Sequence, residues 1–136
     1  MKTRTVCLLA LPAAVLLGTG VLMMRHAPQE GIPAAQEDDR RVYLFMQGWK
    51  GDEIAVQEVT VPESDDTVFS EYAALQESQG LPLARFRGEC AVRYTYQLRD
   101  SALYAELLAA DGILIGAACY DPETHVWLDI QGNTTA

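Results

Sequence analysis

The side chains of this sequence that could do chemistry are few and widely spaced. Cys119 is followed six residues later by His125, and a thiol beside an imidazole can act as a nucleophile with its general base. Arg93 and Glu106 could add a charged pair to such a site. A small buried side chain beside a turn histidine explains the first two residues as well. The sequence therefore predicts no catalytic residue, and an enzyme whose site is assembled from Cys119, Arg93 and Glu106 stays the alternative.

Metal and cofactor sites are not predicted either. A zinc site needs three or four nitrogen or sulfur ligands, and Cys90, Cys119 and His125 do not have the spacing of a ligand motif. The segment 121–123 lacks the alternating oxygen ligands and the glycine of a calcium loop. No glycine-rich phosphate loop follows a predicted strand. We expect no metal ion and no cofactor.

Two helices are predicted to support the sheet. The apolar face of the first is expected to carry residues with helical spacing, namely Val42, Phe45, Met46 and Trp49. A strand through the same segment is the alternative. The second helix should begin at Ser64, Asp65 or Asp66 and end at Gly80, with Leu81 making a Schellman contact. Its apolar face should carry Val68, Phe69, Tyr72 and Leu75.

The remaining elements are predicted to be strands. Residues 53–61 are rich in β-branched side chains and end at Pro62. Three further strands should form an antiparallel meander, with a short fourth after them, at 90–98, 103–110, 113–120 and 125–130. Asp111-Gly112 joins two of them, and this dipeptide is a strong signal for a two-residue hairpin. The predicted fold is α+β: an antiparallel meander of four to five strands packed by two helices and preceded by an N-terminal transmembrane or signal helix.

The hairpin also predicts the register of the sheet. It pairs Ala110 with Ile113, and further along it pairs Leu107 with Gly116 and Tyr104 with Cys119. One face should then carry Val92, Tyr94, Tyr96, Leu103, Leu107, Leu114 and Tyr120, around the small residues Ala105, Gly116 and Ala118. We expect Phe69 and Tyr72 to pack on that face. The opposite face includes Tyr104, Leu108, Ile113, Ile115 and Cys119. The first helix is expected to cover it, and a partner is the alternative.

This register places Cys90 and Cys119 at opposite ends of the sheet. They are about seven residues apart along the strands, or roughly 23 Å. A disulfide needs Cα atoms about 4.4–6.8 Å apart. We therefore expect both thiols to be free, with Cys119 buried.

Charge is distributed unevenly along the chain. The first 26 residues hold Lys2, Arg4 and Arg25 and no acid, a net charge of +3. The remainder holds seven basic and nineteen acidic residues, a net charge of −12. So acidic a surface repels phosphate backbones, which argues against nucleic acid as a partner.

Residues 6–24 form an uncharged, apolar run of nineteen residues. A helix of that length spans about 28 Å, close to the thickness of a hydrocarbon core. The basic residues before it predict a cytoplasmic N-terminus and an extracytoplasmic remainder. A retained signal-anchor in the cell membrane is favoured, because the apolar run continues past the small residues Gly18-Thr19-Gly20. A secreted protein with a cleaved signal peptide is the alternative.

Five regions follow from these observations. Residues 1–5 are a cytoplasmic n-region, 6–24 the membrane segment and 25–36 a flexible tether. Residues 37–131 are expected to form the folded domain, and 132–136 a disordered tail.

Several short segments occur in an order that resembles an uncharacterised bacterial family, domain of unknown function 4830. They are GW at 48–49, VTVP at 59–62, FSEYAALQESQG at 69–80, LARFRG at 83–88, RYTY at 93–96, AELL at 105–108 and LIG at 114–116, before Cys119. The resemblance covers roughly residues 40–130. It implies an N-terminal hydrophobic segment and a usual cysteine near 119, but not at 90. It implies no activity, so it adds no functional residue.

The expected function is that of a membrane-tethered extracytoplasmic binding or interaction module without its own chemistry. The membrane is the expected partner through residues 6–24, and another protein is a further candidate. The alternative is the small extracytoplasmic enzyme described above.

Overall fold

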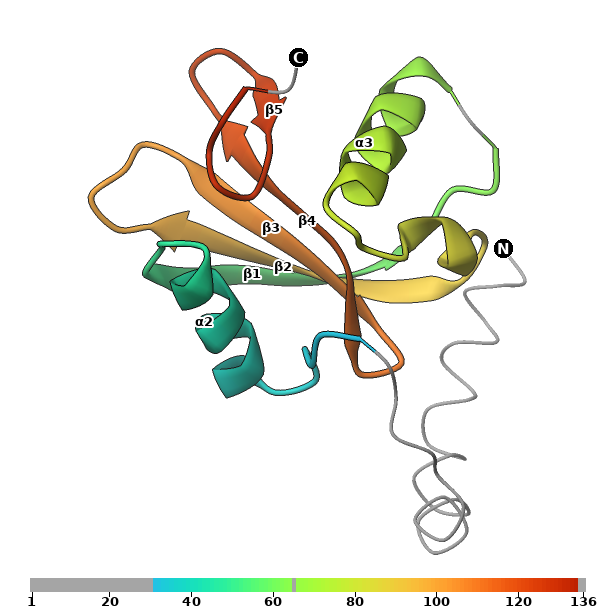
Figure 1. The fold of residues 1–136 in the computed structure, drawn as a ribbon, viewed down its shortest axis with the longest axis horizontal. Coiled ribbons are helices and arrows are strands. Elements are labelled where there is room, and N and C mark those ends of the chain that lie inside the picture. The colour runs from blue at the N-terminus through green and yellow to red at the C-terminus, as the bar shows by residue number, and fades with distance from the viewer. Residues whose placement is uncertain (1–30, 65, 135–136) are drawn as a thin grey trace, which may run out of the picture.

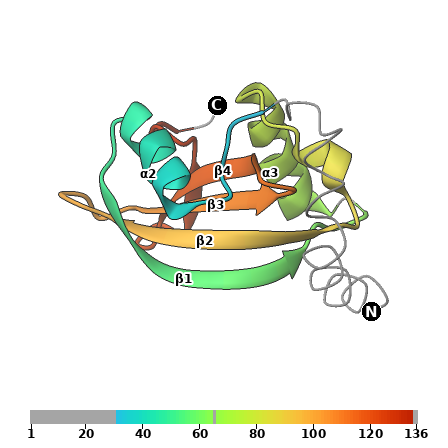
Figure 2. The ribbon, with the colours of Figure 1, turned by 90° about the horizontal axis from the view of Figure 1, so that it is seen from below.

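The computed structural model describes residues 31–64 and 66–134, which form one antiparallel sheet with two α-helices (Figure 1). The sheet order is β1-β2-β3-β4-β5. In chain order the elements are α2 Glu37–Met46, β1 Gly51–Thr60, α3 Thr67–Ser78, the 3-10 helix η1 Leu83–Phe86, β2 Cys90–Leu98, β3 Tyr104–Ala110, β4 Ile113–Asp121 and β5 Val126–Leu128. The predicted α+β class and the antiparallel meander are confirmed. Figure 2 shows β1 as the outermost strand, alongside β2.

The membrane segment predicted at 6–24 lies outside the described residues. Within residues 31–64 and 66–134, none of the helices has the length and apolar character needed to cross a bilayer.

The β3–β4 hairpin has the predicted turn. Asp111 and Gly112 have φ values of 52° and 80°, as a type I′ turn requires, and Ala110 pairs with Ile113. The predicted pairing of β2 with β3 is confirmed as well, since Tyr94 lies opposite Leu107.

The register beyond the turn differs from the prediction by one residue. Leu108 pairs with Gly116 and Ala109 with Leu114, so Ile115 is an extra residue in β4 and forms a β-bulge. Leu107 therefore pairs with Ala117 instead of Gly116. Because side chains alternate along a strand, the shift moves every later residue of β4 to the other face. Cys119 joins the face of Leu107, and Gly116 joins the face of Leu108.

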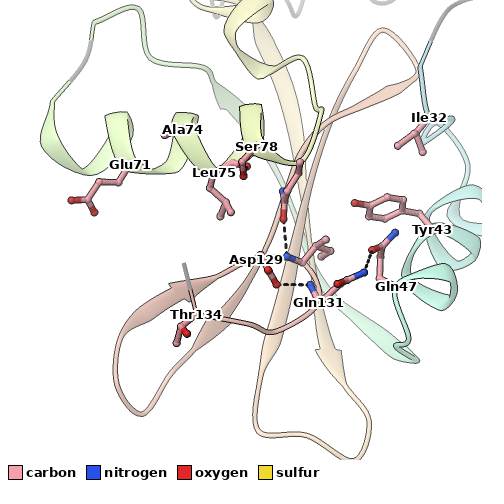
Figure 3. Close-up of a pocket in the computed structure, with 12 residues that line it drawn as sticks. Ile32, Tyr43, Gln47, Glu71, Ala74, Leu75, Ser78, Asp129, Gln131 and Thr134 are labelled. Atoms are coloured by element: carbon pink, nitrogen blue, oxygen red, sulfur yellow. Dashed lines mark hydrogen bonds between the residues drawn. The ribbon is translucent and has the colours of Figure 1, made fainter. Parts of the chain in front are cut away.

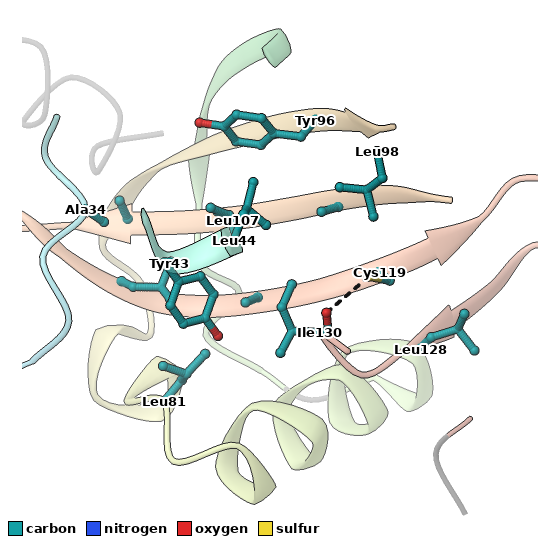
Figure 4. Close-up of a cluster of buried hydrophobic side chains, with 14 residues drawn as sticks. Ala34, Tyr43, Leu44, Leu81, Tyr96, Leu98, Leu107, Cys119, Leu128 and Ile130 are labelled. Carbon is teal, nitrogen blue, oxygen red and sulfur yellow. Dashed lines mark hydrogen bonds between the residues drawn. The ribbon is translucent and has the colours of Figure 1, made fainter. Parts of the chain in front are cut away.

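The two helices are exchanged relative to the prediction. Tyr43 and Leu44 of α2 pack on the face of Tyr96 and Leu107 (Figure 4). Phe69 and Tyr72 of α3 pack instead on the opposite face, with residues of a second cluster that include Leu108 and Ile115. The expected contact with Gly116 still occurs, since the Tyr72 hydroxyl lies 3.2 Å from where a Cβ on Gly116 would stand.

Helix α2 exists as predicted, but its apolar face points outward. Val42, Phe45 and Met46 are exposed, whereas Arg40 is only 5% exposed. The Arg40 guanidinium donates to the Tyr96 hydroxyl, the Glu53 carboxylate and the backbone carbonyls of residues 34 and 35, at 2.9 to 3.3 Å. It also lies 3.5 Å from the centre of the Tyr94 ring. These contacts satisfy the buried charge and fix the helix with this face inward.

Helix α3 has the predicted ends. The Asp66 carboxylate accepts the Phe69 amide at 2.7 Å, which identifies the N-cap among the three candidates. Gly80, with a φ of 79°, and Leu81 complete a Schellman motif, because the Leu81 amide donates to the Gln76 carbonyl.

Gln76 of α3 and Gln79, the C-cap of that helix, bond to the backbone of β4 beyond the end of the short strand β5. The Gln76 carboxamide oxygen accepts the Ala117 amide at 2.7 Å, and the Gln79 amide nitrogen donates to the Ala117 carbonyl at 2.8 Å. The Gln79 oxygen accepts the Ile130 amide at 2.8 Å. Side-chain amides thus take the hydrogen bonds that a longer β5 would make.

The folded region extends beyond both predicted boundaries. Ala34 is buried, and its amide donates to the Gly112 carbonyl at 3.0 Å, so the predicted tether at 25–36 ends before this residue. At the other end, Thr134 forms a β-bridge with Leu128, so the tail predicted at 132–136 belongs to the fold as far as Thr134.

The two cysteines of the sheet have different states. Cys119 is free and completely buried, as predicted, and its Sγ lies 3.4 Å from the Ile130 carbonyl (Figure 4). Cys90 is disulfide-bonded, so the prediction of a free thiol there is wrong. The prediction rested on Cys90 and Cys119 being too far apart to pair with each other. Cys119 is free, so the pairing that was argued against does not occur.

Candidate functional site

The structure brings together two of the residues that the sequence analysis singled out. Arg93 on β2 and Glu106 on β3 lie on the same face, because Arg93 pairs with Leu108 and Glu106 with Thr95. The Arg93 Nε is 3.9 Å from the Glu106 carboxylate, which is an ion pair but too long for a hydrogen bond. Both residues line one hollow beneath α3.

This hollow, which we call the α3 groove, has a volume of about 400 Å³. Its walls come from the end of β1 and the following residues, from α3, and from β2, β3 and β5. Large apolar and aromatic side chains predominate among its lining residues, which are Val59, Thr60, Val61, Pro62, Asp66, Val68, Phe69, Tyr72, Leu83, Arg93, Glu106, Leu108 and Trp127. Tyr72 meets Trp127 edge to face, with ring centres 5.6 Å apart, so the aromatic wall is fixed.

The polar groups of the α3 groove are incompletely paired. The Arg93 Nη2 donates to the Gln57 carboxamide oxygen at 2.5 Å. Its Nε is buried, and the described residues offer it no hydrogen-bond partner. Burial raises the pKa of the Glu106 carboxyl above its usual value, and Arg93 offsets this only in part. The groove therefore presents a donor that lacks an acceptor, beside a carboxyl group that is costly to ionise.

Cys119 and His125 do not join this site. The Cys119 Sγ contacts the Ile130 carbonyl in the core on the other face of the sheet, whereas His125 Nδ1 is 2.9 Å from the Tyr120 hydroxyl at the surface. Burial, followed by the carboxylate of Asp129, raises the pKa of the Cys119 thiol to about 12. A nucleophilic cysteine needs a lowered pKa and access to substrate, and this thiol has neither.

A second, larger hollow lies between α2, α3 and the C-terminal loop (Figure 3). Its volume is about 1000 Å³, and polar side chains surround it. Many of these groups already bond to one another or to the backbone. Gln131 donates to Gln47, Gln79 bonds to three partners, and the Asp129 carboxylate accepts the amides of Gln131 and Asn133. This network holds the C-terminal loop in place, so we regard the α3 groove as the better candidate for a ligand.

The described residues contain no group of three or more histidine, cysteine or acidic side chains placed to bind a metal ion. The scattered Cys90, Cys119 and His125 therefore form no ligand set within residues 31–64 and 66–134.

The sequence analysis missed the aromatic part of the groove. Trp127 was not assigned to any site, and Tyr72 was expected on the other face of the sheet. Arg93 was named only as part of the alternative enzyme site, together with Cys119 and Glu106. The sequence signal that could have revealed the aromatic side of the groove was the presence of aromatic residues in α3 and β5. Comparison with known proteins adds no assignment: no family model, no curated protein and no solved structure matches this chain.

Proposed function

We propose that the chain is a membrane-tethered extracytoplasmic binding module without chemistry of its own, and that the α3 groove is its ligand site. The observation that carries this proposal is the buried Nε of Arg93, which has no hydrogen-bond partner within the described residues and belongs to a side chain that lines an apolar groove. Leaving a buried donor unpaired costs about 1–3 kcal/mol, and a ligand that supplies the acceptor recovers this energy. A concave apolar surface with a few unpaired polar groups is typical of small-molecule sites.

The charges of the groove restrict the ligand. Glu106 lies beside Arg93, and Asp66 also lines the groove, so its negative charge disfavours a carboxylate or phosphate. A neutral amide suits the site better, because its carbonyl can accept from Arg93 Nε while its N–H donates to Glu106. The aromatic wall formed by Phe69, Tyr72 and Trp127 suits an apolar or aromatic group attached to that amide. The ligand class is therefore a small apolar amide.

The alternative, a small enzyme, has weaker support. It required Cys119 to lie with Arg93 and Glu106, whereas the thiol is buried on the other face with a raised pKa. The remaining pair can orient a polar group, which is a binding role.

N-acetyl-phenylalaninamide is a suitable probe, and N-acetyl-phenylalanine is its negatively charged control. We expect the amide to shift the NMR signal of the Trp127 indole N–H in the full-length chain and the carboxylate to do so much more weakly. Arg93→Lys keeps the positive charge but removes the Nε donor, so it should weaken amide binding by about 1–2 kcal/mol. Arg99→Lys, at an exposed ion pair with Asp52 outside the groove, is the matched control and should bind as the unmodified protein does. Equal binding of the amide and the carboxylate would contradict the proposed ligand class. Unchanged binding by Arg93→Lys would contradict the proposed site.

A further inference from the structure

Three large apolar side chains lie together on the outer face of α2. Val42, Phe45 and Met46 are 57%, 66% and 72% exposed, and their spacing places them next to one another on the helix. We call these three residues the α2 patch. These residues form the apolar face expected from the sequence, but this face points to solvent, because the contacts of Arg40 hold the opposite face of the helix against the sheet. Exposed contiguous apolar surface of this kind marks interaction sites.

Basic residues lie along one side of the α2 patch, towards the end of the helix, whereas the acidic residues Glu37, Asp38 and Asp39 occupy its first turn. A hollow of about 310 Å³ beside it is lined by Val42, Phe45 and Trp49 and also by the cationic side chains of Arg41, Lys50 and Arg99. These are three of the seven basic residues that follow residue 26, in a stretch with nineteen acidic residues. Arg41 forms a half-exposed ion pair with Glu37 at 3.7 Å, which can be exchanged at little cost. Arg99 forms a bidentate pair with Asp52 at 2.6 and 3.2 Å and is held more firmly, whereas Lys50 forms no ion pair within the described residues.

The patch lies at the opposite end of the sheet from the point where the chain enters the fold. Ala34 bonds to Gly112 at the β3–β4 turn. The hollow beside the α2 patch instead includes Gly51 and Arg99, and Gly51 pairs with Leu98 at the far end of β2. A membrane segment placed before residue 31 would therefore lie nearer the Gly112 end.

We propose that the α2 patch binds an acidic amphipathic segment of another protein. Apolar side chains of that segment would cover Phe45 and Met46, and its carboxylates would pair with Arg41, Lys50 and Arg99. A second copy of this chain fits less well, because a symmetric contact through the patch would bring these three basic residues against their own copies. This surface is separate from the α3 groove, so the two proposals stand or fall independently.

The test uses the full-length chain in phosphatidylcholine nanodiscs and two synthetic helical peptides, each with leucine on one face. One peptide has glutamate on the other face, and its control has lysine. We expect the glutamate peptide to bind, and raised salt to weaken its binding. The double variant Phe45→Ser/Met46→Ser should reduce its affinity at least about tenfold, and Lys50→Glu should also reduce it. The matched control is Val126→Ser, which changes an exposed apolar residue of β5 and should leave affinity unchanged.

Several outcomes would overturn the proposal. The first is equal binding of both peptides, and the second is unchanged affinity of the Phe45→Ser/Met46→Ser variant with an unaltered melting temperature. Self-association that this variant abolishes would assign the patch to a second copy. Phosphatidylglycerol in the nanodiscs tests for lipid binding. If it displaces the peptide from the unmodified chain but not from Lys50→Glu, whose patch carries less positive charge, the patch contacts lipid instead. An unchanged affinity in Arg93→Lys is expected, because that residue belongs to the α3 groove.

Discussion

At the scale of single residues, the orientation of α2 depends on Arg40. From the spacing of its apolar residues alone, this helix would be expected to pack with Val42, Phe45 and Met46 towards the sheet, since apolar burial is the main driving force of packing. Arg40 instead lies inside with partners from three segments: Tyr96 on β2, Glu53 on β1 and the backbone at residues 34 and 35. With this face inward the guanidinium is fully paired, and Tyr43 and Leu44 are buried in the core beside it, so the helix still buries apolar surface while Val42, Phe45 and Met46 are exposed.

The first prediction concerns this residue. Arg40→Lys keeps the charge but cannot reproduce the planar fork that reaches Tyr96, Ala34 and Glu53 together, so it should lower the free energy of unfolding by about 2–4 kcal/mol. Urea denaturation of both proteins measures the change. The matched control is Arg41→Lys at the adjacent exposed position, which should alter stability by less than about 0.5 kcal/mol. Equal stability of the two variants would show that the buried fork does not fix α2.

At the scale of elements, the β3–β4 hairpin is set by its two-residue turn. Gly112 has a φ of 80°, and a Cβ there would meet nothing closer than Ala35 at 3.9 Å. Any effect of a side chain at this position must therefore come from the backbone conformation and not from a clash.

Gly112→Val should destabilise the protein by about 1–2 kcal/mol or more, because a β-branched residue resists positive φ. Gly112→Asn is the comparison, since asparagine tolerates this conformation and should cost much less. Thermal unfolding followed by circular dichroism gives both values. If valine and asparagine are tolerated equally, the turn does not require the left-handed conformation.

The elements also show which parts of the fold could be predicted from the sequence. Local signals identified the α3 caps, the Asp111-Gly112 turn and the β2–β3 register, because each depends on residues close together in the chain. The bulge at Ile115 was missed because residues 113–119 are apolar or small at every position, so no alternation fixed the register, and its one-residue shift exchanged the faces of β4. The one local signal was Gly116 next to it, since a glycine inside a strand often marks a bulge. The outward face of α2 depends on contacts of Arg40 with residues up to 56 positions away. The same long-range dependence explains why the sequence analysis did not assign Trp127 to any site.

At the scale of the whole molecule, the close packing of residues 32–34 limits the length of any tether. Leu114 donates to the Ile32 carbonyl at 2.8 Å, and Pro33 forms a bridge with Ile113. Residues 25–31 can span at most about 25 Å when extended. The proposed membrane segment would therefore hold the domain close to the bilayer.

This geometry gives a prediction for the full-length chain in cells. The protein should sediment with membranes. After reduction of the Cys90 disulfide, external protease should release the domain by cutting before Ile32, because the following backbone is bonded to the sheet. Mass spectrometry of the released fragment identifies the cut, and cells that are not treated with protease provide the control. Recovery of a mature protein that begins at Val21 would show cleavage by a signal peptidase and contradict the retained anchor.

The hydrogen bonds of Gln76 and Gln79 to β4 also help to protect the molecule from aggregation. An unpaired strand edge can template the addition of another chain, and β5, with three residues, covers only part of β4. Gln76 and Gln79 occupy the donor and acceptor of Ala117, so an incoming strand finds them already used. At the other edge, β1 has a bulge between Glu53 and Ala55 and carries the acidic residues Asp52, Glu53 and Glu58. Growth of the sheet into fibrils is thus opposed at one edge by a helix and at the other by irregular geometry and negative charge.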